Sequence, residues 1–332
     1  MPKTATDPGL GVLTGATMGT AWQVRVDDPL SQAELEALSR ALQAAVDEVD
    51  SQMSTWKADS DLMRFNAAEL GVWIALPAAL MEVLQAGLAV SELTDGAFEM
   101  NVGEAVRAWG FGPERIALEA IRAASVAPRV RAVDALRLDR AAGLACKTAA
   151  LTLDLSGIAK GYGVDRLAET LMHRGVAHAL CAIDGEVRAI GARATGAPWA
   201  IGIDAPDGVV RGDHSVILLA DAAVATSGDY RHYVTVAERR LSHTMNPLTR
   251  APMVGVPASV TVMGQSCMMA DAMATALMVL GPQDGLRIAA REGIHALILR
   301  REAHGLQASA TGLFLGFGDV DSTGRPKEAA LI

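Results

Sequence analysis

The chain has 332 residues, of which 51% are hydrophobic and 20% are charged. This composition argues against long disordered stretches and allows either one large domain or two ordinary ones. The formal net charge of -9 argues against an extended nucleic-acid surface, because neutralising phosphates requires clustered Lys and Arg, and no such cluster occurs.

The chain shows no sign of a membrane span or an export signal. It contains no run of about 18 apolar residues, and its first residues lack the basic and then apolar segment of a secretory signal. We therefore expect a protein that is not itself transmembrane and that, as written, is cytoplasmic. Residues 1–13 are expected to form a flexible N-terminal segment and residues 14–332 a single domain.

The first predicted elements are a strand and a helix. Thr20–Val26 is strand-like, and Ser31–Met53 carries apolar residues at three- and four-residue spacing, which predicts an amphipathic helix. Ser31 followed by Glu34 predicts a capping box, in which each side chain accepts a hydrogen bond from a free amide of the first turn. A loop with a short helical tail is expected over Ser54–Asn66.

The next elements lead to an unusual polar stretch. A helix is predicted over roughly Pro77–Thr94, a loop rich in glycine and aromatic residues over Asp95–Pro113, and a helix with short strands over Glu114–Thr152. A strand-like apolar run then ends at Asp154 in the stretch Leu153–Val164, which reads LDLSGIAKGYGV.

Two interpretations of this polar stretch are open from the residues alone. The first is an ordinary strand-to-helix turn, in which Asp154 or Ser156 caps the helix and the glycines permit the bend. The second is a polar cradle for a ligand such as a phosphate, because a helix N-terminus offers free amides and a favourable dipole to anions. A helix is expected to follow as far as His173.

The C-terminal half alternates strands and turns before a buried helix. Ala179–Val236 contains several strands, Ser259–Ser266 reads as another, and Cys267–Leu280 predicts a helix that is apolar nearly all round and must be buried. The three cysteines are odd in number and far apart, which argues for buried apolar residues and against disulfides. Strands and helices mix without strict alternation, which favours an α+β fold.

The predicted buried helix carries two polar residues on one face. Asp271 and Thr275 are four residues apart, so both side chains project from the same side of the helix. A buried carboxylate must be protonated, paired or bound to a cation, and a carboxylate with a hydroxyl suits Mg²⁺. The alternative is that Asp271 accepts from a neighbouring amide and Thr275 bonds back to its own helix.

The motifs taken together resemble one known family. The chain lacks GxxxxGK[ST], HExxH, GxSxG and a GxGxxG that opens a βαβ unit. From about Thr14 to Ile298 it carries, in this order, the motifs GATMGTAWQV, STWKADSDLMRFN, DGAFEMNVGEAVRAWGFGP, LDLSGIAKGYGVDRLAE, DGEVRAIG, AVATSGDY, LSHTMNP and ADAMATALMVLG. With these motifs the chain resembles the ApbE family of FAD:protein FMN transferases.

The resemblance implies a fold, a reaction and two ligands. The fold would be a single α+β domain related to T-fold proteins, with mixed sheets flanked by helices. The reaction would be Mg²⁺-dependent transfer of FMN from FAD to a Thr or Ser hydroxyl of a target protein, by phosphoester formation with release of AMP. Phosphoryl transfer requires mainly positioning and charge stabilisation, which a metal ion, a lysine and a histidine base can supply.

The resemblance also assigns site residues, each by its matching motif position. The residues implied for catalysis are His243 as the base for the target hydroxyl, Lys160 and Asp271. Those implied for FAD binding are Met18, Trp56, Ala97, Phe98, Glu99, Asp154, Lys160 and Met245. Those implied for Mg²⁺ are Asp271, Thr275 and the backbone carbonyl of Gly157.

Four positions depart from the usual family pattern. Glu99 replaces an aspartate, Asp184 a glycine, Asn246 an aspartate and Arg250 a glycine. A different conformation is expected for the loop at Arg250, because arginine tolerates a positive φ poorly. None of the four is an implied metal ligand, so activity is expected to survive these changes.

The partners follow from the same resemblance, and two other functions remain open. The acceptor would be a membrane-associated redox subunit with a Ser/Thr-containing flavinylation motif; the family usually acts at the outer face of the cytoplasmic membrane or in the periplasm, whereas this chain shows no export signal. A Mg²⁺-dependent FAD pyrophosphatase that releases FMN and AMP would use the same residues without an acceptor. A non-catalytic FAD-binding module would have little need for Asp271, Thr275 and His243 together.

Overall fold

The computed structural model describes residues 10–206, 213–229, 233–236, 239–255, 257–302 and 305–317. The chain divides into two compact units, each built from more than one segment. Within the described residues, the first unit takes the chain up to Asp47, Lys160–Gly228 and the part from Pro257 onward. The second unit takes Glu48–Ala159 and the part from Asp229 to Gly255.

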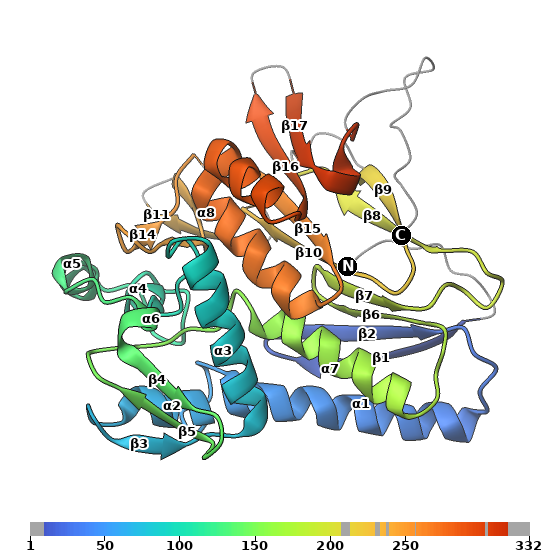
Figure 1. The fold of residues 1–332 in the computed structure, drawn as a ribbon, viewed down its shortest axis with the longest axis horizontal. Helices are drawn as coiled ribbons and strands as arrows, with labels where there is room; N and C mark the ends of the chain where they lie inside the picture. The colour runs from blue at the N-terminus through green and yellow to red at the C-terminus, as the bar shows by residue number, and fades with distance from the viewer. Residues whose placement is uncertain are drawn as a thin grey trace. The chain divides into compact units, whose positions relative to one another are not determined.

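The first unit is built on an eight-stranded antiparallel sheet in the order β1-β2-β6-β7-β10-β15-β16-β17 (Figure 1). Its strands are β1 (Gly11–Thr17), β2 (Thr20–Val26), β6 (Ala179–Ile183), β7 (Glu186–Ile190), β10 (Ala223–Gly228), β15 (Ser259–Gly264), β16 (His295–Glu302) and β17 (Gly305–Thr311). The unit also holds β8 (Trp199–Asp204), β9 (Asp213–Leu219), α7 (Ala159–His173), α8 (Cys267–Arg291), the 3-10 helix η1 (Gly312–Phe314) and most of α1 (Gln32–Met53).

The two faces of this sheet are covered by different elements. Because side chains alternate along a strand, Cys181 of β6 packs against α1 and α7, whereas its neighbour Leu180 faces the opposite side. That opposite side is covered by the β8–β9 hairpin and the C-terminal segment around Phe314. Fully buried Leu42 of α1 and Leu167 of α7 lie in the core on the helical side.

The second unit contains short helices, a three-stranded sheet in the order β3-β5-β4 and two hairpins. Its elements are α2 (Asp61–Ala67), β3 (Trp73–Ala75), α3 (Ala78–Leu93), α4 (Gly103–Ala108), α5 (Leu118–Val126), α6 (Ala132–Ala135), β4 (Leu136–Asp139), β5 (Leu144–Lys147), β11 (Tyr233–Val236), β12 (Arg239–Ser242), β13 (Met245–Asn246) and β14 (Ala251–Pro252). The predicted α+β class is confirmed, and the strand pairs of the described residues are antiparallel.

Most predicted elements occur where the residue pattern places them. The strand Thr20–Val26 is β2, and the capping box forms, with the Ser31 amide donating to Glu34 Oε2 at 2.8 Å and the Glu34 amide donating to Ser31 Oγ at 3.3 Å. The three cysteines are buried and free. Among the residues that the structure describes, every helix is too short or too polar to span a bilayer.

Two predictions differ from the structure. The loop expected over Asp95–Pro113 contains α4. The flexible segment expected over residues 1–13 lies outside the described residues as far as position 9, and β1 already begins at Gly11. The helix expected to end at Leu280 does end there, because Gly281 has a non-helical φ of 71°, and Pro282 then starts the second helical stretch of α8.

A substitution in the helical core tests this packing. Leu42→Ala removes a fully buried side chain and leaves a cavity, so the free energy of unfolding is expected to fall by about 2–5 kcal/mol in urea denaturation. The matched control Leu118→Ala, at an exposed position of α5, should change it by less than about 0.5 kcal/mol. Equal losses in the two variants would contradict the described core.

Candidate active site

A cluster of charged side chains lies at the start of α7 and in the turn between β6 and β7. Lys160 Nζ donates to Glu186 Oε1 at 2.9 Å and to Asp184 Oδ2 at 3.3 Å. Glu186 is only 2% exposed, and Asp271 of α8, 4% exposed, is close enough for its charge to act on Lys160. The first unit therefore brings together Lys160 and Asp271, two of the three predicted catalytic residues.

The backbone of α7 approaches α8 very closely beside this cluster. The Gly161 amide donates to Asp271 Oδ2 at 3.0 Å. A Cβ atom added to Gly161 would lie 2.4 Å from the Cys267 carbonyl oxygen and 2.8 Å from Asp271 Cβ. Only glycine allows the two helices to meet here, so one glycine of the polar stretch has a packing role as well as an amide contact.

The charged groups of the cluster shift one another's pKa values. Burial and the charge of Glu186 raise the pKa of Asp271 to about 7, although the charge of Lys160 and the Gly161 amide act in the opposite direction. Burial alone would lower the pKa of Lys160, but the charges of Glu186, Asp271 and Asp184 outweigh it and raise that pKa. Lys160 is therefore a positive charge that persists at neutral pH.

Thr275 extends the polar face of α8 by one turn. Its Oγ1 lies 3.3 Å from the Oγ of Ser227 at the end of β10. Asp271 and Thr275 project from the same side of α8, as their spacing predicts, and the side chains between them are buried alanine and methionine. One half of the alternative also holds, because the Gly161 amide occupies one oxygen of Asp271, whereas the Thr275 hydroxyl pairs with Ser227 instead of with its own helix.

The oxygen atoms of this region suit a magnesium ion that takes only a few ligands from the protein and the others from water and a substrate. Among the described residues, no group of three or more His, Cys, Asp or Glu side chains is arranged to hold a metal ion. A site based on Asp271 and Thr275 would therefore offer one carboxylate and one hydroxyl. Mg²⁺ is commonly bound in this way, with waters and phosphate oxygens completing its octahedron.

The segment before α7 differs from the prediction, because residues 151–155 form no β-strand within the part of the chain that the structure describes. The Asn66 side chain replaces a neighbouring strand: its Oδ1 accepts from the Leu153 amide at 2.8 Å and its Nδ2 donates to the Leu153 carbonyl at 2.9 Å. Asn101 Oδ1 accepts from the Thr152 amide at 2.8 Å. Side-chain amides can thus satisfy a backbone without a β-ladder, which residue periodicity does not reveal.

Asp154 lies at the end of this segment in the second unit. Its amide donates to the Met100 carbonyl at 2.8 Å, and its Oδ1 accepts from the Ser156 amide at 2.9 Å. The turn interpretation is therefore correct for Asp154, whose side chain stabilises the turn that leads into α7. Burial raises the pKa of Asp154. Gly157 lies in the same turn, and its part as a metal ligand stays a prediction.

The predicted triplet Ala97, Phe98 and Glu99 follows α3 in the second unit. Phe98 is buried, and its amide donates to Thr94 Oγ1 at 3.2 Å. Glu99 Oε1 accepts from the amides of Asn101 at 2.8 Å and Ala132 at 3.1 Å. The other oxygen, Oε2, is buried without a hydrogen-bond partner, and burial raises the pKa of this carboxyl. An unsatisfied buried oxygen is a feature that a bound donor would relieve.

Two predicted flavin contacts lie in turns, one in each unit. Met18 has a φ of 45° in the two-residue turn between β1 and β2. Its side chain packs against the hydrophobic core on the helical side of the eight-stranded sheet, near Gly163. Trp56 of the second unit is 65% exposed, which is uncommon for so large an apolar side chain. An exposed indole is available for stacking on a flat ring.

The loop that carries His243 and Met245 is held by local contacts of the second unit. Met245 is buried against Ala105 and Val106 of α4. His243 is half-buried and directly follows β12. Ser242 Oγ accepts from the Thr244 amide at 3.2 Å, so the backbone on both sides of the histidine is fixed.

Two departures from the family pattern support this loop. Asn246 Oδ1 accepts from the Leu248 and Thr249 amides at 2.8 and 3.1 Å, a role that an aspartate would also fill. A different conformation of this loop is expected because arginine tolerates a positive φ poorly, but that reason does not apply here, since Arg250 has a φ of 53°. Its buried guanidinium donates to the carbonyls of Ala124 and Pro128, at 3.4 and 2.7 Å, and these bonds offset the backbone strain.

Glu186 was not identified as a site residue from the sequence, yet it is the nearest acidic partner of Lys160. Its signal is a buried carboxylate at the first position of the short strand β7. Asp184, the third departure, occupies the preceding turn with a φ of 54°, a conformation that aspartate tolerates better than most residues. Sequence spacing could not show that both carboxylates point toward Lys160.

Comparison with known proteins agrees with this arrangement. A sequence profile described as the ApbE family matches residues 18–298. A protein of Vibrio cholerae with the name FAD:protein FMN transferase is 34% identical over 306 residues, which is 92% of this chain and 92% of the relative.

Two solved structures are also similar over most of the chain. The flavin transferase ApbE from Vibrio cholerae has a TM-score of 0.82 and 32% identity, and the match covers 92% of this chain and 98% of that one. The apo form of the Pseudomonas stutzeri flavinyl transferase ApbE has a TM-score of 0.79 and 37% identity, with 91% and 94% covered.

The close approach of α7 and α8 can be tested by a single methyl group. Gly161→Ala is expected to lower the free energy of unfolding by roughly 1–3 kcal/mol, because the new Cβ meets backbone that cannot yield. The control Gly163→Ala, two residues on, meets only the terminal methyl groups of Ile183 and Met18 at 2.9 Å and should cost less. An equal or smaller loss for Gly161→Ala in chemical denaturation would contradict this packing.

Proposed function

Because the chain belongs to the ApbE family, we propose that it transfers FMN from FAD to a hydroxyl group of a target protein. The acceptor oxygen forms a bond to the phosphorus of the FMN half, the pyrophosphate P–O bond breaks, and AMP leaves. The acceptor is a Ser or Thr of a redox protein, which we further propose to be membrane-associated. The observation that carries the proposal is the cluster in which the partly exposed Lys160 lies beside the buried carboxylates of Glu186 and Asp271.

Lys160 has the charge and the setting to hold a pyrophosphate. Its side chain is partly exposed, at 25%, while Glu186 holds the ammonium group in position. Ion pairing maintains its positive charge at neutral pH. A preoriented cation stabilises the negative charge that develops as the P–O bond breaks, and needs little rearrangement to do so.

Asp271 and Thr275 are the proposed protein ligands of Mg²⁺, together with the Gly157 carbonyl. Mg²⁺ would neutralise negative charge on the phosphate oxygens of FAD. Asp271 must be ionised to bind a cation, and because burial and the charge of Glu186 raise its pKa, cation binding would compete with protonation of this carboxylate. The Gly161 amide keeps the carboxylate oriented in either state.

The other proposed contacts belong to FAD and the acceptor. For FAD, Trp56 offers an exposed ring and Glu99 offers an oxygen that has no hydrogen-bond partner. Phe98 is the third proposed FAD contact, and its side chain is buried. His243 is the proposed base that takes the proton of the acceptor hydroxyl, since a histidine titrates close to neutral pH. Met18, Ala97, Asp154 and Met245 complete the proposed FAD site.

Mass spectrometry of an acceptor peptide tests the reaction. Incubation with FAD, Mg²⁺ and a Thr-containing peptide should add the mass of one FMN, and EDTA should prevent the addition. Asp271→Asn removes a proposed ligand and should slow the transfer at least about a hundredfold while leaving the protein folded. If AMP and free FMN form while the peptide is unchanged, the result favours the pyrophosphatase. If FAD binds but is not cleaved, the result favours the flavin-binding module.

His243→Ala tests the proposed base. Loss of a general base should lower kcat by roughly 10²-fold or more, with little change in the affinity for FAD measured by flavin fluorescence. The control His173→Ala alters an exposed histidine at the end of α7 and should keep the wild-type rate. A His243 variant that loses FAD binding as much as turnover would show that the residue serves binding.

A further inference from the structure

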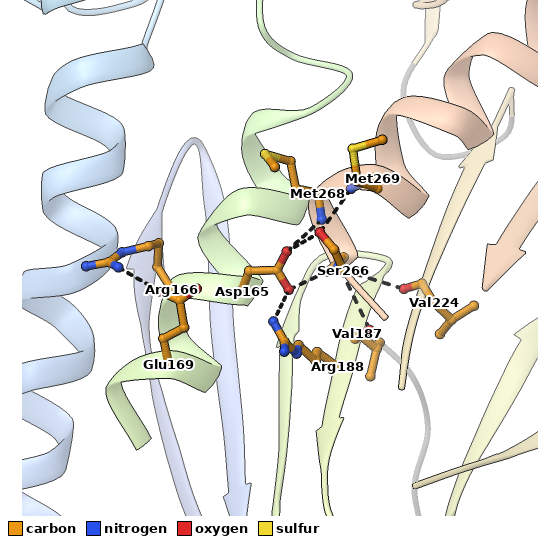
Figure 2. Close-up of polar contacts among 10 residues, drawn as sticks. Asp165, Arg166, Glu169, Val187, Arg188, Val224, Ser266, Met268 and Met269 are labelled. Atoms are coloured by element: carbon orange, nitrogen blue, oxygen red, sulfur yellow. Dashed lines mark hydrogen bonds and ion pairs between the residues drawn. The ribbon is translucent and has the colours of Figure 1, made fainter. Parts of the chain in front are cut away.

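A buried carboxylate outside the proposed site lies between α7, β7 and α8. Asp165 of α7 accepts four hydrogen bonds, from Arg188 Nη1 at 2.6 Å, Ser266 Oγ at 2.8 Å, and the amides of Cys267 and Met268 at 3.0 Å each. Figure 2 shows Asp165 between the arginine and the beginning of α8. The reaction as proposed uses none of these side chains.

Each of the three elements that Asp165 connects also carries a residue of the charged cluster. Lys160 belongs to α7, Glu186 lies two positions before Arg188 on β7, and Asp271 lies on α8. Because residues two apart in a strand face the same side, Glu186 and Arg188 both point from β7 toward α7. The Asp165 bonds therefore constrain the elements from which the cluster is built.

Asp165 and Gly161 attach α7 to α8 at two successive turns. They are four residues apart, so they lie on one face of α7. Gly161 donates to Asp271 itself, whereas Asp165 accepts from the first amides of α8. Because the two contacts lie at different positions along α7, they restrict both translation and rotation of α8 relative to α7. They therefore determine where Asp271 and Thr275 point.

The contacts require a carboxylate at this position. Oδ1 receives Arg188 and the Cys267 amide, and Oδ2 receives Ser266 and the Met268 amide, so both oxygens act as acceptors. An asparagine would turn an NH₂ group toward two of these donors. A negative charge is also favoured at the N-terminus of a helix, where the free amides of α8 point.

We propose that Asp165 is a positioning residue of the transferase, which holds the first turn of α8 against α7 and β7 so that Asp271 and Thr275 keep the geometry that binds Mg²⁺. This inference rests on the proposed function, since it takes those two residues as the ligands. In this role Asp165 acts through Asp271 and Thr275 and is not itself one of the proposed ligands. Residues that orient metal ligands from outside the coordination sphere typically change metal affinity by 10- to 100-fold when removed.

Metal binding without turnover tests this role. Mn²⁺ alone is titrated into the metal-free full-length protein, and unbound Mn²⁺ is followed by its EPR signal. Asp165→Asn should weaken Mn²⁺ binding by about 10- to 100-fold. In the transfer reaction the same variant should need more Mg²⁺ for half-maximal rate, and saturating Mg²⁺ should restore most of kcat.

The matched control is Asp27→Asn. Asp27 is also a carboxylate bonded to an arginine and a backbone amide, with Arg193 Nε at 2.8 Å and the Ala194 amide at 2.9 Å, but it joins loops that carry no proposed ligand. Asp27→Asn should lower the melting temperature without changing the Mn²⁺ affinity more than about twofold. A general loss of stability therefore cannot imitate the expected result.

A milder variant covers the case in which Asp165→Asn does not fold. Ser266→Ala removes one of the four donors to Asp165 and should weaken Mn²⁺ binding by at least about threefold. Ser60→Ala, which removes the N-cap of α2, should leave the Mn²⁺ affinity unchanged.

The outcomes separate this inference from the proposed function. If the wild type binds Mn²⁺ and Asp271→Asn abolishes binding, but neither Asp165→Asn nor Ser266→Ala changes the affinity, the positioning role is overturned and the metal site stands. If Asp271→Asn binds Mn²⁺ as the wild type does, the metal assignment is overturned and the positioning role with it.

Discussion

Asp271 is a carboxylate buried in a helix of alanine, methionine and leucine side chains, and such a charge is costly unless nearby groups compensate it. The first unit supplies that compensation from α7, through the Gly161 amide and the charge of Lys160. Glu186 in turn holds Lys160. The antiparallel sheet places these elements so that their charged ends meet while their apolar faces form one core.

The same contacts explain why a polar stretch with three glycines leads into α7. Gly161 admits the α8 backbone, Lys160 reaches the β6–β7 turn, and Asp154 stabilises the turn before the helix. A capping turn and a ligand cradle are therefore compatible interpretations of one segment. The backbone of the turn uses the Asp154 carboxylate, whereas the Lys160 side chain stays 25% exposed.

Positions that depart from the family pattern are accommodated by local contacts rather than by a changed fold. Arg250 adopts a positive φ, which its buried guanidinium offsets through two carbonyls, and Asn246 accepts the hydrogen bonds of its turn as an aspartate would. Glu99 uses one oxygen for backbone amides and leaves the other unsatisfied. Asp184 adds a second carboxylate near Lys160, which balances more of the lysine charge.

The sequence by itself determined the helices with clear periodicity, the strand Thr20–Val26, the capping box at Ser31, and Asp271 with Thr275 on one helix face, because each depends on residues close together in the chain. Only the tertiary structure decided that Glu186 pairs with Lys160, that Asn66 replaces a strand beside Leu153, and that Asp165 joins three elements. These contacts link residues 23 to 103 positions apart, and no local pattern specifies which distant groups will meet.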